Sequence, residues 1–391
     1  MDFKLTADIV FTGGSIITVD KSNTIHTGLA VKGNKILFVG SEEDAKKLIG
    51  EETEVVDLAG RSLVPGFIDS HLHTGVMGAN ALAIDCRSPG VSSIEDIKKL
   101  IAERVKVTPK GEWIRGWGYD HSKLAEQRHP NRWDLDEVAP DYPVILTRVC
   151  AHISAHNSKS LEIAGITDES EAPEGGVYMR ENGHVNGVML EYAHMQAMKV
   201  SGLSHQELLN AMEVANDMLI KEGITSLHDS GGYGFVQMGA FQDAVNQGKL
   251  KVRIYSMIFS FVKNLNFNHT YLDIGLHTGF GSERFKIGPS KLMIDGSSSG
   301  PTAATLEPYT SDPNSHGILS MDPKDVDEFV LKAHKAGYQV TSHAVGDKAV
   351  TVIVNAIEKA MKAYPREDCR HRIEHCAMIN DELLDRIKAL G

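Results

Sequence analysis

The sequence has little cysteine and a shortage of positive charge, and each shortage excludes a class of protein. Four cysteines in 391 residues, with no C-x-x-C spacing, are too few for a scaffold held by disulfides and fit a reducing cytoplasm. The 40 lysines and arginines are outnumbered by 52 aspartates and glutamates, and the resulting net charge of −12 repels phosphate backbones and anionic membrane surfaces. Nucleic acid is therefore not an expected partner.

Long apolar runs are also missing. No segment approaches the roughly 20 apolar residues of a membrane-spanning helix. Asp2 and Asp8 stand where a secretory signal would be basic and then apolar. We therefore expect a cytoplasmic protein that is neither embedded in a membrane nor exported by that route. What remains, 42% hydrophobic and 24% charged residues, is the composition of a globular protein with a large core.

The apolar pattern divides the chain into a small β domain, residues 1–62, and a larger α/β domain, residues 63–391. In the first, β-branched and polar residues alternate between glycine-marked reversals. The second opens with LVPGFIDSHLH, an apolar run typical of a strand buried on both faces of a parallel sheet. After Gly202, helical and strand patterns alternate, giving six β/α units with that first strand. Residues 85–201 break this rhythm and are predicted to be an insertion after the first strand.

Polar residues gather at one recurring place in the second domain. Each group lies at or just past the C-terminal end of a predicted parallel strand, where (β/α) barrels assemble their active sites. This shared position is a stronger signal than any single motif. The groups are His71 with His73, His228 with Asp229, Lys291 with Asp295, His343 with Asp347, and His375.

The histidines suggest a metal site. His71 and His73 lie two residues apart on an extended strand and therefore share a face. By itself this pair also fits two hydrogen-bonded histidines. With His343 and His375 on two further strands, the set matches what a catalytic zinc needs, about three protein ligands and one open position.

Lys291 opens the apolar strand LMI, an unusual place for a lysine without a partner. Its amine either reaches solvent from the strand end or is desolvated, which lowers a lysine pKa and frees a nucleophilic amine.

The segments PGFIDSHLH, SHAVGDKAV and RIEHC, with the lysine on a strand between them, resemble the amidohydrolase superfamily of metal-dependent hydrolases. More narrowly, WIRGWGYD, KLMIDGSSSG, HAVGD and HRIEHC are similar to the branch that contains N-substituted formamide deformylase-like proteins. The resemblance covers essentially the whole chain. It implies a (β/α)8-type TIM barrel, of which about six units are present, and a small β-sandwich for the N-terminal domain.

The resemblance also implies a metal centre of one or two divalent ions, with zinc expected. His71 and His73 would bind one ion, His343 and His375 the other, and Lys291, carboxylated by CO2, would bridge them. A carbamate supplies two hard oxygen donors and a negative charge that offsets the cations. Some relatives bridge through cysteine instead, but Cys86 lies outside a strand end, so Lys291 is preferred.

Such a centre activates water and polarises a carbonyl, so we expect hydrolysis of an amide, a formamide or another non-peptide C–N bond in a small molecule. Two alternatives remain. A ring deaminase would use one metal and no bridging lysine, and a catalytically silent barrel would act as a regulatory or binding module. The family habit of pairing barrels makes a homodimer the expected assembly.

The family carries a general-base aspartate at the end of its eighth strand, which this sequence lacks. The chain stops at Gly391, after the helix that follows the sixth strand. Asp229, Asp295 and Asp347 are acids near the site, but none occupies that position. An arc of six strands would leave unpaired edges, so we expect the chain to be an incomplete version of a longer polypeptide.

Further residues are candidates for the substrate pocket, each with a structural alternative such as packing or a hydrogen-bonded pair. Asp347 is expected to cap the helix that begins at Lys348 rather than to orient His343. Arg372 is expected to face away from His375 and to pair with a carboxylate. The Ser297–Gly300 run is read as a loop over the mouth of the site. The pocket candidates are Trp117, Tyr119, His152, Asn157, His228 and Asp295.

Overall fold

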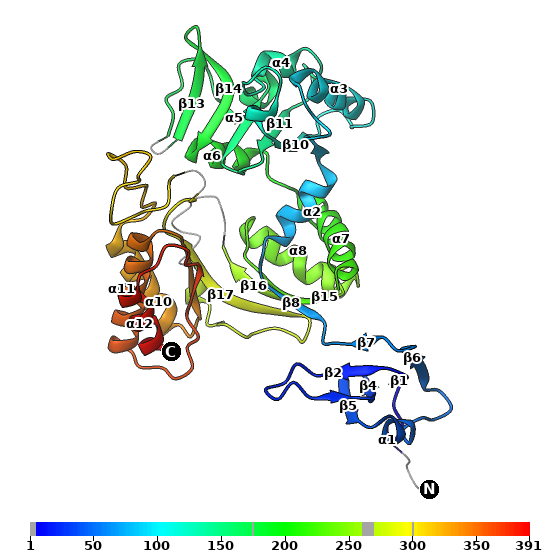
Figure 1. Cartoon of the computed structure of the whole chain (residues 1–391). Helices are drawn as coiled ribbons and strands as arrows, with labels where there is room; N and C mark the ends of the chain where they lie inside the picture. Colours follow the sequence, from blue (N-terminus) through cyan, green and yellow to red (C-terminus); the bar gives the residue numbers. More distant parts are fainter. Residues whose placement is uncertain (1–4, 174–175, 260–269, 299–300) are drawn as a thin grey trace. The chain divides into compact units, whose positions relative to one another are not determined.

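The computed structural model describes residues 5–173, 176–259, 270–298 and 301–391. The chain forms two compact units, Met1–Phe67 and Ile68–Gly391. The ribbon in Figure 1 follows the element order of each unit.

The first unit consists of short strands in two sheets. One sheet has the order β5-β4-β1-β6 and the other the order β3-β2-β7. Val10 is buried between half-buried neighbours in β1, so the alternation read from the sequence does turn one face inward. The elements are β1 (Ile9–Thr12), β2 (Ser15–Ile17), β3 (Ile25–His26), β4 (Gly28–Lys32), β5 (Lys35–Gly40), α1 (Glu42–Lys46), β6 (Glu54–Asp57) and β7 (Ser62–Leu63).

The second unit contains a six-stranded sheet in which spatial order equals chain order, β8-β15-β16-β17-β18-β19. Successive strands from β15 to β19 pair in parallel. The predicted alternation of strand and helix is therefore confirmed as an α/β barrel architecture. The strands are β8 (Phe67–Leu72), β15 (Ile224–Asp229), β16 (Arg253–Ile258), β17 (Phe285–Met293), β18 (Val340–Ala344) and β19 (Arg372–His375).

The sheet is rolled rather than flat. Five strand spacings would separate β8 from β19 by about 24 Å in a flat sheet. Instead, Glu374 Oε2 on β19 lies 2.5 Å from His71 Nδ1 on β8, and Arg372 donates to the backbone oxygen of Ser70 at 3.0 Å. The first and last strands thus face one another across the interior of the barrel.

Amphipathic helices cover the outside of this sheet (Figure 1). In α11, residues spaced three and four apart, such as Val350, Ile353, Val354 and Ile357, are buried in one core with α10 and β18. Local signals fix the helix starts, for example the capping box of Ser204 and Glu207 at α7. The helices are α2 (Thr74–Leu82), α7 (His205–Lys221), α8 (Gly234–Asn246), η2 (Tyr271–Asp273), α10 (Pro323–Lys335), α11 (Asp347–Ala363) and α12 (Asp381–Leu390).

Strand β17 begins six residues before Lys291, the residue expected to open this strand. Gly288 and Pro289 are poor strand residues, yet the strand starts at Phe285 and runs through both. The pairing with β16 shifts by one residue between Ser256 and Ile258, opposite this Gly-Pro pair. The irregularity accommodates the proline and keeps the strand continuous.

A second sheet, of order β13-β14-β12-β11-β10-β9, lies between β8 and β15 in the chain. In this sheet β10 and β11 pair in parallel, and β13 and β14 form an antiparallel pair. The elements are β9 (Ile84–Asp85), α3 (Ile94–Val105), β10 (Ile114–Tyr119), η1 (His121–Lys123), α4 (Arg132–Asp136), β11 (Val144–Arg148), β12 (Ile153–His156), α5 (Ser158–Ala164), β13 (Gly176–Glu181), β14 (His184–Glu191) and α6 (Tyr192–Val200).

Of the helices in the described ranges, none combines the length and the apolar character needed to span a lipid bilayer.

The packing of α2 on α7 yields a stability prediction. A Cβ atom added at Gly78 would lie 1.9 Å from the backbone oxygen of Ala211, whereas one added at Gly75 on the same helix would meet its nearest atom at 3.4 Å. Gly78→Ala is therefore expected to lower the free energy of unfolding by about 1–3 kcal/mol through overpacking. Urea unfolding followed by circular dichroism measures this difference.

Gly75→Ala is the matched control, because it gains the same helix propensity, worth about 1 kcal/mol, without the clash. Equal effects of the two substitutions would contradict the packing described for α2 and α7.

Candidate metal centre

The carboxyl ends of the barrel strands bring four imidazole rings together. The ring centroids of His71 and His73 lie 5.4 Å apart, those of His71 and His375 4.9 Å, and those of His343 and His375 4.6 Å. These residues come from the end of β8, from β18 and from the end of β19. His375 is exposed, so the group is open to solvent on one side.

Three of these rings are oriented by hydrogen bonds on the ring nitrogen that faces away from the group. His73 Nδ1 lies 2.7 Å from the Gly231 carbonyl oxygen, and His343 Nε2 lies 3.0 Å from that of Gly296. Since a carbonyl only accepts, these nitrogens carry the proton, and His73 Nε2 and His343 Nδ1 keep their lone pairs. His71 Nδ1 faces Glu374 in the same way. Metal-binding histidines in proteins show this pattern of outer hydrogen bonds.

Three of the histidines have a lowered pKa, which favours the neutral form that binds metals. Burial, with a contribution from the charge of Lys291, lowers the pKa of His73 to about 3. Partial burial of its ring and the neighbouring His343 lower the pKa of His375 to about 4. Burial also lowers the pKa of His343.

His375 has a strained backbone. Its φ of 69° lies in the left-handed region, as does the φ of 47° at Cys376. Two adjacent non-glycine residues in this region cost on the order of 1 kcal/mol each or more. The strain ends β19 sharply at His375, whose ring lies beside those of His71 and His343.

Lys291 is buried within β17, with 2% of its surface exposed. Its Nζ donates to the Ser230 carbonyl oxygen at 3.2 Å and lies 4.9 Å from the centre of the Phe259 ring. Burial lowers the pKa of Lys291 to about 8, so an appreciable fraction of its amine is neutral near physiological pH. The Ser230 hydroxyl is buried and has no hydrogen-bond partner among the residues that the structure describes, so it could bond a further polar group next to this lysine.

Glu374 is a member of the site that the sequence analysis missed. Its side chain is 2% exposed and accepts hydrogen bonds from Thr341 at 2.6 Å and Arg372 at 2.8 Å, besides its contact with His71. Burial opposes ionisation, but these hydrogen bonds and the charge of Arg372 outweigh it and lower the pKa of Glu374 to about 2. Arg372 and Glu374 are two apart on a strand, a spacing that could have revealed a shared face.

The expectation for Arg372 was therefore right about a carboxylate partner and wrong about direction. Its guanidinium points into the barrel, where Nη1 also lies 2.8 Å from His228 Nδ1. His228, a pocket candidate, belongs to this interior cluster and packs its ring 4.9 Å from that of Tyr255. Burial, followed by the charge of Arg372, lowers the pKa of His228.

Asp295 and Asp229 are buried carboxylates that hold loops after the strands. Asp295 accepts from the backbone of Ala304, Val345 and Gly346, and its Oδ1 lies 3.5 Å from His343 Nε2. Burial raises the pKa of Asp295. Asp229 accepts from the backbone of Thr74 and Gly231 and from Gln237, and burial raises its pKa to about 6.

The helix-cap expectation for Asp347 is wrong. Gly346 is the N-cap of α11, and Asp347 is its first helical residue, whose Oδ1 accepts from the backbone of Leu306 at 2.8 Å and of Lys348 at 2.9 Å. Asp295 has taken the position beside His343, because the end of β18 wraps around its carboxylate.

Two residues expected in the substrate pocket are instead buried within the insertion, residues 85–201. Asn157 is fully buried and caps α5. Its Oδ1 accepts from the Val144 backbone, and its Nδ2 donates to the backbone oxygens of Ala139 and Tyr142. Tyr119 is fully buried and bonds His129 at 3.0 Å. Neither side chain is accessible to a substrate, so both expectations are corrected.

The other residues named from the insertion differ in their surroundings. His152 is partly exposed, bonds Glu191 at 3.0 Å and contributes to the lowered pKa of His343. Trp117 is half-buried on β10. Cys86 is buried in the insertion core, and burial raises its pKa to about 12, which does not suit a bridging thiolate. Part of the loop expected at Ser297–Gly300 lies outside the described residues.

Neutral imidazoles and a desolvated lysine at the carboxyl ends of parallel barrel strands are the arrangement of a metal-dependent hydrolase of the α/β-barrel class. Residues 54–391 match the model of the Amidohydrolase family, and the chain belongs to that family.

Named relatives span the length of the chain. Protein LONG AFTER FAR-RED 3 of Arabidopsis thaliana is 31% identical over 95% of this chain and 64% of its own length. N-substituted formamide deformylase of Arthrobacter pascens is 25% identical over 98% of this chain and 71% of its own length. The crystal structure of an uncharacterized metal-dependent hydrolase from Pyrococcus horikoshii OT3 superposes with a TM-score of 0.81 at 28% identity, covering 98% of this chain and 73% of that one. The chain thus spans less than two thirds of the plant relative.

Glu374 yields a prediction about acid stability. Its folded pKa is depressed, so the stability it contributes is present above the ordinary carboxyl pKa of 4.5 and is lost as the pH falls from there toward about 2. Glu374→Gln has no carboxylate to protonate at this position. We therefore expect its free energy of unfolding to fall less than that of the wild type between these pH values. Urea midpoints measured over this range with a chelator present test it.

Glu103→Gln is the control, since Glu103 is an exposed partner of Lys106. If the stability of Glu374→Gln falls as steeply with decreasing pH as that of the wild type, the lowered pKa of Glu374 is refuted.

Proposed function

We propose that the protein is a metal-dependent amidohydrolase that cleaves an amide or another non-peptide C–N bond. One observation carries this proposal: four imidazoles, three of them oriented by outer hydrogen bonds, converge near a buried lysine at the strand ends. The deformylase relative, which bears the name of a reaction on N-substituted formamides, supports this class of bond.

The proposed metal ligands are the five residues at the strand ends, and the donor set fits a zinc-class ion, because imidazole nitrogen suits zinc. One or two ions per chain are proposed, with zinc as the metal. A divalent ion there lowers the pKa of a coordinated water and polarises the scissile carbonyl. The ligands are His71, His73, Lys291, His343 and His375.

Lys291 is proposed to carry a carbamate. Its neutral amine adds to CO2, forming an N–C bond and releasing one proton, and the product is an anion with two oxygen donors. The burial that lowers the pKa of Lys291 to about 8 supplies the neutral amine for this step. The buried Ser230 hydroxyl, which has no partner in the described part of the chain, supports a further polar group beside the lysine.

Other residues of the chain position the ligands. Glu374 holds the Nδ1 side of His71 and prevents that ring from turning. The carbonyl of Gly231 fixes His73, and Asp295 ties the end of β18, and with it His343, to the backbone of Ala304. Buried Asp229 fixes the start of α2 just after His73.

The organisation of the whole protein is also proposed. Residues 1–62 form the small β-sandwich domain, residues 63–391 the barrel, and residues 85–201 the insertion that contributes to substrate choice, with His152 and Trp117 as its candidates. A cytoplasmic location is supported by four cysteines that form no disulfide. A small-molecule substrate and a homodimer complete the proposal.

Metal analysis tests the ligands. We expect Lys291→Ala and His73→Ala each to lower the metal-to-protein ratio by about one or two equivalents after dialysis against chelator-treated buffer, since each removes a ligand of a site with few. A loss of two equivalents in Lys291→Ala supports a bridged pair, whereas metal kept in Lys291→Ala together with a loss of one equivalent in His73→Ala supports the single-metal site of a deaminase.

His184→Ala is the matched control, because His184 is an exposed histidine bonded to Asp168. The ratio should stay unchanged in this variant. Full metal retention in both Lys291→Ala and His73→Ala would reject the ligand assignment. With 13C-labelled bicarbonate, a carbamate resonance present in the wild type and absent from Lys291→Arg tests the modification separately.

A further inference from the structure

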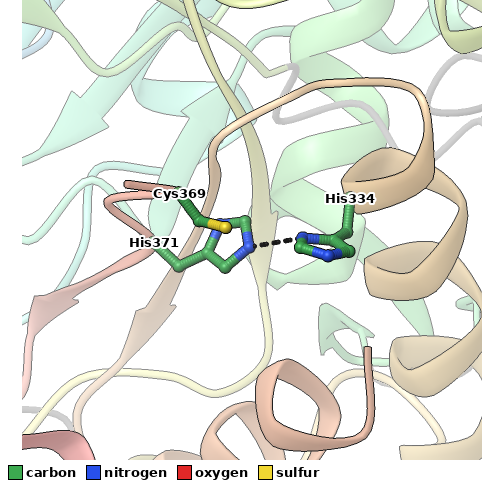
Figure 2. Close-up of side chains that lie close together, drawn as sticks. All are labelled: His334, Cys369 and His371. Carbon is green, nitrogen blue, oxygen red and sulfur yellow. Dashed lines mark hydrogen bonds between the residues drawn. The ribbon is translucent and has the colours of Figure 1, made fainter. Parts of the chain in front are cut away.

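A second group of metal-binding side chains lies at the opposite end of β19. His371 immediately precedes β19, whereas His375 ends it. Four residues of extended chain separate them by about 13 Å. His371 is joined by Cys369 and by His334 near the end of α10, and Figure 2 shows the two imidazole rings facing each other with the sulfur beside them.

The three donors are close and sheltered. One ligand atom from each residue lies within 4.8 Å of the others. His334 is fully buried and Cys369 is 8% exposed. Arg366 holds the segments together, because its guanidinium donates to the backbone oxygens of His334, Gly337 and Tyr338. The cluster is therefore part of the packed structure.

The outer hydrogen bonds define the protons of the two rings. His334 Nε2 lies 2.6 Å from the Tyr364 carbonyl oxygen and must carry a proton, so the lone pair of its Nδ1 points into the cluster. The Val340 backbone N–H donates to His371 Nδ1 at 2.9 Å, so the proton of His371 is on Nε2. That proton is donated to His334 Nδ1 at 2.9 Å. A single proton thus lies between two nitrogens in a sheltered site.

We propose that His334, Cys369 and His371 bind a zinc-class divalent transition-metal ion at the amino-terminal end of the barrel strands. The ion takes the place of the proton between the rings. Tetrahedral bonds of about 2.0–2.1 Å to nitrogen require the two nitrogens to lie about 3.3 Å apart. The observed 2.9 Å needs to open by only a few tenths of an ångström.

The donor types select the metal. Two imidazoles and a thiolate suit zinc, cobalt and copper and disfavour calcium and magnesium, which prefer oxygen. The protons balance as follows. The Cys369 thiol releases its proton to solvent, and the proton of His371 moves from Nε2 to Nδ1, with loss of the hydrogen bond from Val340. Each bound ion therefore releases one proton, and His334 keeps its outer bond to Tyr364, as metal-binding histidines do.

The position of this cluster suits a structural metal site rather than a catalytic one. It joins α10, which precedes β18, to the segment that leads into β19, and it lies away from the strand ends where substrates bind in barrels. Metal binding should therefore stabilise the fold without being required for the chemistry proposed at the other end.

Cobalt substitution tests the proposal, because a thiolate bound to Co2+ gives a near-ultraviolet charge-transfer band, and the five proposed catalytic ligands include no sulfur. Metal-depleted wild-type protein titrated with Co2+ should show this band, and its final intensity should correspond to about one thiolate-bound ion per chain. Cys369→Ser should abolish it, while Cys86→Ser, Cys150→Ser and Cys376→Ser retain it. His73→Ala should lose metal at the catalytic centre and keep the band, which separates this proposal from the proposed function.

Absence of the band in the wild type, or its persistence in Cys369→Ser, would overturn the proposal. Zinc X-ray absorption spectroscopy of the wild-type protein is a second test. It measures the zinc–ligand distances and does not depend on the folding of a variant. A Zn–S distance of about 2.3 Å is expected, and a spectrum with only nitrogen and oxygen neighbours would also overturn it.

Discussion

The contact between Glu374 and His71 is the interaction on which the rest of the barrel unit depends. It joins the last strand of the rolled sheet to the first, and it places a carboxylate behind a proposed metal ligand. A buried carboxylate is costly unless it is paired and hydrogen-bonded. Arg372 and Thr341 meet that requirement, so one interior cluster both keeps the sheet curved and orients the site.

Periodicity and strand-end position predicted much of the site from the sequence. The H-x-H spacing, the lysine in an apolar strand and the two later histidines were visible because strands alternate and parallel strands end at one edge. The structure does bring the rings of His71, His73, His343 and His375 together. It also buries Lys291.

The supporting contacts were not predictable in the same way. Glu374 meets His71 only because the sheet rolls, and that curvature leaves no local pattern in the chain. Asp295 lies beside His343 because the loops after β17 and β18 converge on it. A polar side chain such as Asn157 can line a pocket or cap a helix, and the sequence does not distinguish the two roles. In the structure its hydrogen bonds to neighbouring backbone groups show that it is a cap.

Strand β19 has a further consequence for folding. His371, Glu374 and His375 make their contacts at the two ends and in the interior of a four-residue strand. A slip of one residue against β18 would turn Ile373 inward and move Glu374 to the opposite face. Glu374 would then lose the hydrogen bond from Thr341 and its contact with His71, and the histidines at both ends would leave their partners at the same time. A misregistered intermediate would lose several hydrogen bonds together, so this short strand has one strongly preferred alignment.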